Sequence, residues 1–236
     1  MQLFYHPEIT ETSTEIRFDK EESRHIGKVL RKQEGDELIV TNGEGIIFTT
    51  RLTSVHHKQC VASVQRLEKQ PPLPYSLHLA VAPTKLNDRY EWFLEKATEI
   101  GITEITPIIC DHSERRVIKP ERYEKILVSA MKQSNKAYKP VLNEACSISD
   151  FLASERSQAG LRCIAHCEES QKQSLKSVLQ PKTSVLILIG PEGDFSSEEI
   201  QKAKEKGFRA VHLGESRLRT ETAAVVACHS VAFVNE

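Results

Sequence analysis

From residue 77 to residue 234, short apolar runs alternate with longer amphipathic segments, and no other feature of the sequence constrains the fold as strongly. The apolar runs have the length of buried strands, and the segments between them repeat apolar residues at helical spacing. Strands are predicted at residues 77–81, 105–110, 161–165, 185–189 and 210–213. Helices are predicted at residues 88–100, 123–134, 196–207 and 220–234, the third opened by a Ser196–Glu199 capping box. This alternation is typical of an α/β domain whose parallel sheet carries helices on both faces.

A proline-rich stretch, Gln70-Pro71-Pro72-Leu73-Pro74, interrupts the chain before this pattern begins. Prolines lack a backbone donor and favour extended linkers, so we predict one domain over residues 1–70 and a second over residues 75–236. The first domain is predicted to be a small β-barrel with strands at residues 37–41, 46–52 and 60–64. One helix is expected within it, with Ile26, Val29 and Leu30 on its apolar face.

Composition excludes several classes of protein. The 32 Lys and Arg against 33 Asp and Glu, with 39% hydrophobic residues, argue against a disordered chain or a histone-like polycation. The longest apolar run, residues 185–189, is far too short to span a membrane, and the N-terminus lacks a secretory pattern. We therefore expect a cytoplasmic protein without a membrane partner.

The six cysteines include no CxxC pair, so neither a disulfide framework nor a zinc ribbon is expected. Only Cys163, His166 and Cys167 cluster, and no second pair of ligands accompanies them. Buried thiols are therefore predicted here, and no metal site.

Two strand ends carry unusual loops. The first runs from Gly190 to Ser196, where two glycines bracket a Pro-Glu pair and leave backbone groups open to a ligand. The second, residues 213–224, places two arginines and two acids between a strand and a mostly apolar helix. Each loop also has a simpler interpretation. The first is then only a turn between a strand and a helix. In the second, Thr220 is the N-cap of the helix and Glu221 lies in the first turn, where its charge complements the helix dipole.

Charge is unevenly distributed. Residues 112–140 hold eight basic and three acidic side chains, a local excess of five positive charges. Such a run is commonly a solvated helix face, but it also suits a phosphate backbone.

Three motifs together resemble one family. Gly190-Pro191-Glu192-Gly193, then Leu213-Gly214, then Leu218-Arg219-Thr220-Glu221-Thr222-Ala223-Ala224 are similar to the uridine-N3 methyltransferases of small-subunit ribosomal RNA, the ribosomal RNA small subunit methyltransferase E family of the SPOUT superfamily. The resemblance covers nearly the whole chain. The sequence departs from the family pattern at Asp194, where glycine is frequent, and at Ser216-Arg217, where arginine followed by an aliphatic residue is expected.

The resemblance implies a PUA-like RNA-binding barrel, followed by a SPOUT domain with a trefoil knot that binds S-adenosylmethionine and pairs with a second subunit as a homodimer. It also implies that the partner is 16S ribosomal RNA within the small ribosomal subunit. It implies no metal cofactor. The implied cofactor-binding residues are Cys167, Ile189, Gly190, Pro191, Glu192, Gly193, Leu213, Gly214, Leu218 and Thr220. The implied RNA-binding residues are Arg31, Arg115, Arg116, Gln133 and Lys136.

The chemistry of methyl transfer to uracil N3 suits these residue types. Placement of the two reactants supplies much of the acceleration, but the N3 proton must be lost. Arg219 is predicted to stabilise negative charge on the uracil carbonyl oxygens, and Glu221 or Glu192 is a candidate base. A capping role for Glu221 and a structural role for Glu192 remain open.

Two other functions compete with this hypothesis. A ribosome-binding module without catalysis would need only the barrel and the basic stretch, but it leaves the two loops without a purpose. A nucleotide-dependent enzyme on a doubly wound sheet is disfavoured because the sequence contains no phosphate-binding motif.

Overall fold

The computed structural model describes residues 2–158, 160–169 and 171–236, which form two compact units. The first unit extends to Pro72 and includes residues 131–139; the second comprises residues 73–130 and 140–236. The segment 131–139, which the sequence analysis assigned to the second domain, therefore belongs with the first unit. Its Ala137 carbonyl accepts a hydrogen bond from Thr41 Oγ1 at 3.2 Å.

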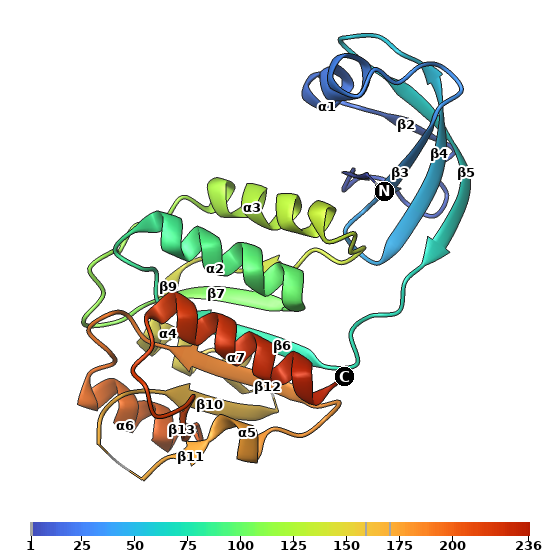
Figure 1. The fold of residues 1–236 in the computed structure, drawn as a ribbon. Helices are drawn as coiled ribbons and strands as arrows, with labels where there is room; N and C mark the ends of the chain where they lie inside the picture. The colour runs from blue at the N-terminus through green and yellow to red at the C-terminus, as the bar shows by residue number, and fades with distance from the viewer. Residues whose placement is uncertain (1, 159, 170) are drawn as a thin grey trace. The chain divides into compact units, whose positions relative to one another are not determined.

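The first unit is built on a curled five-stranded sheet (Figure 1). Its strand order is β1-β3-β4-β5-β2, and the pairing is antiparallel except between β1 and β3. Phe4, Phe18 and Phe48 lie in the core of this unit. The strands are β1 (Leu3–Tyr5), β2 (Glu15–Arg17), β3 (Glu37–Thr41), β4 (Ile46–Ser54) and β5 (Val61–Lys69).

The helical part of the first unit differs from the prediction. A short α1 (Lys20–Arg24) is followed by a π-helical turn, His25–Val29, in which the Leu30 N–H donates to the His25 carbonyl. The wider turn moves later residues away from their α-helical positions. The prediction that Val29 lies on an apolar face is therefore wrong: its exposed fraction is 67%, whereas Ile26 is buried.

The second unit contains an eight-stranded sheet in which every pairing is parallel, and the prediction of a parallel sheet is confirmed. The main path has the order β11-β13-β10-β12-β6-β7-β8, and β9 pairs with β7. The strands are β6 (Ser76–Val81), β7 (Glu104–Ile109), β8 (Val141–Leu142), β9 (Cys146–Ser147), β10 (Leu161–Ala165), β11 (Gln173–Ser174), β12 (Ser184–Ile189) and β13 (Arg209–His212).

Helices cover both faces of this sheet (Figure 1). One face carries α2, α3, α5 and α7, and the opposite face carries α4 and α6. The predicted Ser196–Glu199 capping box is present at the start of α6. The helices are α2 (Asn87–Ile100), α3 (Pro120–Gln133), α4 (Ile148–Ala153), α5 (Leu175–Val178), α6 (Ser197–Glu205) and α7 (Thr220–Val234), with a 3-10 turn at Glu155–Gln158.

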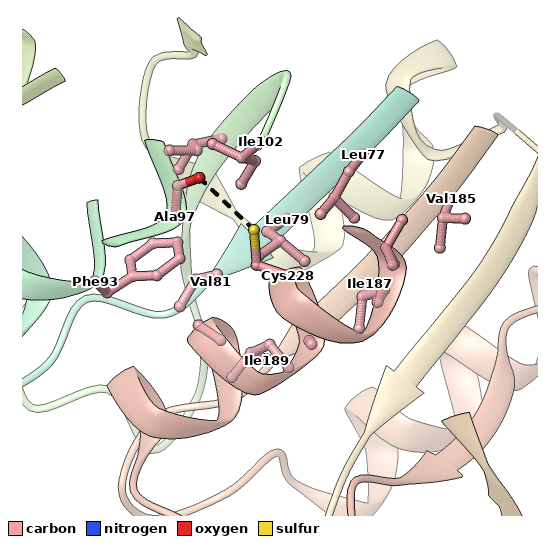
Figure 2. Close-up of a cluster of buried hydrophobic side chains, with 14 of the residues drawn as sticks. Leu77, Leu79, Val81, Phe93, Ala97, Ile102, Val185, Ile187, Ile189 and Cys228 are labelled. Carbon is pink, nitrogen blue, oxygen red and sulfur yellow. Dashed lines mark hydrogen bonds between the residues drawn. The ribbon is translucent and has the colours of Figure 1, made fainter. Parts of the chain in front are cut away.

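The central strands are apolar on both sides because each face is buried. On β12, Val185, Ile187 and Ile189 point to the α7 side, while Leu186 and Leu188 point to the α6 side. Figure 2 shows the α7 side, where side chains from β6, β12 and α2 surround Cys228 of α7. The Cys228 thiol lies 3.7 Å from the Ala97 carbonyl, so α7 approaches α2 closely.

No helix in the described ranges is long and apolar enough to cross a membrane.

Leu79 lies at the centre of this core and has no exposed surface. We predict that Leu79→Ala lowers the free energy of unfolding by about 2–5 kcal/mol, because it removes buried methyl groups and leaves a cavity. Urea denaturation followed by circular dichroism measures the change. Val141→Ala, at a position 56% exposed, is the matched control and should change stability by less than about 0.5 kcal/mol. Equal losses in the two variants would contradict this account of the core.

Candidate functional site

Three loops meet at one edge of the sheet in the second unit. Strand β10 lies between β13 and β12, and all three run parallel, so their carboxyl ends share an edge. The loops that follow them begin at His166, Gly190 and Leu213. This edge is where ligands bind in open parallel sheets.

Two adjoining cavities, of about 260 and 270 Å³, open between these loops. They share five lining residues, Ala165, Cys167, Arg217, Leu218 and Ala223, and so form one composite site. The first cavity extends toward Lys172 and His212, and the second toward Glu192 and Asp194. The lining combines apolar side chains with a few polar groups, as small-molecule sites do.

Hydrogen bonds between the loops fix the shape of the site. Thr220 Oγ1 donates to the Gly190 carbonyl at 3.0 Å, which ties the start of α7 to the loop after β12. Asp194 Oδ2 accepts from the Cys167 N–H at 2.7 Å, which ties the same loop to the end of β10. Asp194 holds a positive φ of 64°, so the departure from glycine noted in the sequence adds a carboxylate that joins two loops.

The glycines of the site serve different purposes. A Cβ at Gly190 would lie 3.1 Å from the Phe195 ring, and a Cβ at Gly193 would lie 2.9 Å from His112 Cβ. These two positions therefore need glycine for packing inside the loop. Gly214 differs: its φ is +144° and the space at its Cβ position is open, so the backbone conformation itself requires glycine there.

Several buried polar atoms at the site lack a hydrogen-bond partner within the described part of the chain. They are both ring nitrogens of His166 and one carboxylate oxygen each of Glu192 and Glu221. Burial, and then the charge of Lys172, lower the pKa of His166, so its ring is neutral at pH 7. Because an unsatisfied buried polar group is costly, these atoms are candidates for contacts with a ligand.

The two predicted catalytic residues differ in exposure. Arg219 is the N-cap residue of α7 and is exposed, and its side chain makes no cap hydrogen bond. The predicted alternative of a cap at Thr220 is therefore wrong, because Thr220 is the first helical residue and bonds to Gly190 instead. Glu221 is buried, and its Oε1 lies 3.8 Å from Arg89 Nε of α2.

Most of the predicted cofactor-binding residues line the composite site. The second cavity brings Ile189, Gly190, Pro191, Glu192 and Thr220 together, and the first adds Leu213 and Gly214. Both cavities contact Cys167 and Leu218, and the second contacts Arg219. Gly193 and Glu221 are not among the lining residues of either cavity.

Other lining residues were not named individually from the sequence. His166, Glu215, Ser216 and Arg217 lie in the loops around His166–Glu168 and Leu213–Thr220 that the family resemblance implied for the cofactor. The residues that the sequence analysis missed are Ala165, Lys172, Asp194, Val211, His212 and Ala223. Ala165, Val211 and His212 end β10 or β13, so applying the strand-end rule to every predicted strand would have found these three. Cys163 is buried as expected, whereas Cys167 is exposed. Within the described ranges, no group of three or more His, Cys, Asp or Glu side chains could hold a metal ion.

The predicted RNA-binding arginines of the second unit contact backbone carbonyls. Arg115 Nε donates to the Thr84 carbonyl at 3.1 Å, and one Nη donates to the Lys85 carbonyl at 2.9 Å. The Lys85 N–H in turn donates to Glu192 Oε1 at 2.9 Å. Arg115 therefore supports a segment that holds Glu192. Arg116 is exposed and donates to the Asp111 carbonyl.

The other predicted RNA-binding residues belong to the first unit. Arg31 and Gln133 are exposed, and Lys136 is half-buried. Arg31 holds a positive φ of 54° two residues after the π-helical turn.

Comparison with protein families matches both units. The RNA methyltransferase domain family matches residues 71–232, and the RNA methyltransferase PUA domain family matches residues 18–65. The predicted fold class, an α/β domain preceded by a PUA-like domain, is confirmed. The trefoil knot stays a prediction.

Individual relatives span nearly the whole chain. The ribosomal RNA small subunit methyltransferase E of Bacillus subtilis is 30% identical over 230 residues, which covers 92% of this chain and 89% of the relative. A probable rRNA-methyltransferase from Porphyromonas gingivalis has a similar structure, with a TM-score of 0.92, 43% identity and coverage of 100% of this chain and 98% of that one. The ribosomal RNA small subunit methyltransferase E from Neisseria gonorrhoeae, bound to S-adenosyl methionine, has a TM-score of 0.88, 27% identity and the same coverage.

We predict that Thr220→Val lowers the free energy of unfolding by about 1–3 kcal/mol. Valine keeps the shape of threonine but leaves the Gly190 carbonyl without its donor. Urea denaturation measures the loss, and Thr220→Ser should recover most of it. Thr222→Val, at a half-buried position in the same helical turn, is the matched control and should change stability by less than about 0.5 kcal/mol. A Thr220→Val variant as stable as this control would show that the bond does not hold the loops together.

Proposed function

We propose, because the chain belongs to the ribosomal RNA small subunit methyltransferase E family, that it methylates N3 of one uridine in 16S ribosomal RNA. The chain is an S-adenosylmethionine-dependent ribosomal RNA methyltransferase, as its resemblance to this family predicted. The observation that carries the N3 assignment is the composite site itself, which places an exposed arginine beside cavities suited to the cofactor. The small ribosomal subunit as the substrate and a cytoplasmic location stay predictions.

The lining of the composite site fits S-adenosylmethionine. Ile189, Leu218 and Ala223 offer apolar surface for an adenine ring, and unpartnered nitrogens of His166 are free to bond with polar groups of the ligand. The open side of Gly214 allows close approach of a ligand to the backbone. When bound, this cofactor supplies an activated methyl group and its sulfur becomes neutral. The chain therefore needs mainly to orient the two reactants.

The residues around the second cavity can assist loss of the N3 proton. The Arg219 guanidinium has no partner that holds it in the described structure, so its donors are available to the uracil carbonyl oxygens. Stabilising charge on these oxygens lowers the pKa of the N3 proton. Glu192 lines the cavity and has a free buried oxygen, which makes it the better candidate base on geometry. Glu221 lies behind the lining and next to Arg89, which favours a supporting role.

The outer face of α7 is a candidate interface for a second copy of the chain. Phe233 is 63% exposed, and its ring lies 5.9 Å from that of His229 one turn earlier. Val226 continues the same stripe and is half-buried. An exposed aromatic residue on an otherwise apolar helix is typical of an interface, so we propose that the homodimer forms here.

We predict that Phe233→Lys raises the dissociation constant of the dimer at least tenfold, because a charge would enter an apolar contact. Sedimentation velocity over a concentration series measures it. Val117→Lys, at a position 78% exposed in the same unit, is the matched control and should leave association unchanged. A Phe233→Lys chain that associates like the wild type would remove this face from the interface.

We predict that Arg219→Lys binds S-adenosylmethionine nearly as tightly as the wild type but transfers the methyl group about a hundredfold more slowly. Lysine keeps the charge but cannot present the planar pair of donors. Loss of one preorganised donor to a developing anion typically costs roughly 3 kcal/mol. The defect should shrink as pH rises, because more of the uridine is already ionised.

Calorimetric titration gives the cofactor affinity, and single-turnover methylation of 16S ribosomal RNA at several pH values gives the rate. Arg217→Lys is the control, since Arg217 lines the same cavity and its Nη2 donates to the Glu192 carbonyl at 3.4 Å. A rate defect that stays constant with pH, or a loss confined to cofactor affinity, would assign Arg219 to binding alone. Failure of the wild type to bind S-adenosylmethionine, with ATP or NAD binding instead, would favour the nucleotide-dependent alternative.

A further inference from the structure

The basic side chains of the first unit fall into two groups. Four basic side chains, on the sheet strands and on the 131–139 segment, form ion pairs. The pairs are Arg17 with Glu15, Arg66 with Glu68, Lys69 with Glu11 and Lys132 with Glu22. By contrast, Lys20, Arg24, Lys28 and Lys58 have no carboxylate within ion-pair distance in the described structure. The uncompensated charges come from α1, the π-helical turn and the turn between β4 and β5.

These three segments are packed against one another. Gly27 of the π-helical turn lies so close to Val55 that a Cβ there would be 3.3 Å from Val55 Cγ1. Ser23 of α1 accepts the Cys60 N–H at 2.7 Å, which fixes the turn between β4 and β5 on the helix. Lys28 and Lys58 both act electrostatically on the same side chain, His57, and so does Lys20.

The turn between β4 and β5 also carries two adjacent histidines. The rings of His56 and His57 lie with their centroids 4.2 Å apart, and both side chains are exposed. The Lys58 N–H donates to His56 Nδ1 at 3.3 Å. We call the set Lys20, Lys28, His56, His57 and Lys58 the histidine-lysine surface.

The charged groups that act on His57 are all basic. Partial desolvation, then electrostatic interaction with the neighbouring His56 ring, and then the positive charges of Lys58, Lys28 and Lys20 lower the pKa of His57. The ring is therefore neutral at pH 7 when nothing is bound. A phosphate group placed among these side chains would favour the protonated ring, so binding of a phosphate backbone and uptake of a proton assist each other.

We propose that the histidine-lysine surface binds the phosphate backbone of RNA, and that protonation of His57 strengthens the binding as pH falls. The proposal rests on the proposed function only in taking RNA as the polyanion. Lys20, Lys28 and Lys58 come from three segments, and none of them forms an ion pair in the described structure. Several such cations match a chain of phosphates better than they match a single anion. The surface shares no residue with the predicted RNA contacts Arg115 and Arg116, which belong to the second unit.

The test measures binding of a fluorescein-labelled uridine-rich RNA of 20 nucleotides to the full chain by fluorescence anisotropy. In Lys28→Gln/Lys58→Gln we expect roughly tenfold or weaker binding at 100 mM salt, and a slope of log affinity against log salt that is smaller by about 1.4. Arg66→Gln/Lys69→Gln removes two ion-paired cations from β5 of the same unit and is the matched control. It should change the slope little.

The histidines are tested separately. Wild-type affinity should rise roughly tenfold between pH 8 and pH 6, because His57 takes up a proton on binding. His57→Gln should lose this rise and keep wild-type affinity at pH 8. All variants should bind S-adenosylmethionine like the wild type and melt at the same temperature by circular dichroism.

Three outcomes would overturn the proposal. A lysine variant whose salt slope matches the ion-paired control would show that the surface makes no phosphate contact. A His57→Gln variant that keeps the pH dependence would exclude His57 as the titrating group. Tighter binding of a polyglutamate peptide than of RNA, lost in the lysine variant, would assign the surface to an acidic protein. If the wild type bound no RNA at all while still binding S-adenosylmethionine, the RNA substrate of the proposed function would fail instead.

Discussion

Burial of α7 against the centre of the sheet is the interaction on which the catalytic unit depends. Ala224, Ala227 and Cys228 are small enough to bring the helix close to β6, β12 and α2, as Figure 2 shows for Cys228. This close packing fixes where the helix begins. Because Arg219 and Thr220 stand at that beginning, the position of the site follows from the position of the core.

The site depends on bonds between loops as much as on the loops themselves. Thr220 connects the start of α7 to Gly190, and Asp194 connects the Gly190 loop to Cys167. Each bond joins segments that follow different strands, so the loops hold one another in place without a metal or a disulfide in the described structure. Polar atoms are then left unpaired at the cavities, where a ligand can satisfy them.

The first unit differs from the second in how its charged side chains are distributed. Arg17, Arg66 and Lys69 on its strands are paired with carboxylates, whereas Lys20, Lys28 and Lys58, on α1, the π-helical turn and the turn between β4 and β5, form no ion pair in the described structure. A chain with a net charge of −1 can bind a polyanion only if its cations are concentrated in this way. The overall composition therefore says little about nucleic-acid binding, and the placement of ion pairs says more.

The sequence by itself determined the features that depend on neighbouring residues. The alternation of apolar runs gave the parallel sheet, the Ser196–Glu199 spacing gave the capping box, and the glycine loop marked part of the site. Each of these follows from local hydrogen bonding and from burial of one face, which the order of residues encodes directly.

Only the tertiary structure decided which distant segments meet. Strand order places the end of β10 between the two predicted loops, and no local pattern specifies that order. The same holds for the packing of residues 131–139 with the first unit, and for Arg115, whose donors are used to hold backbone carbonyls. The π-helical turn exposes Val29 although its spacing fits an apolar helical face. In each case the deciding contacts join residues far apart in the chain, and their free energy comes from packing that a local sequence pattern does not contain.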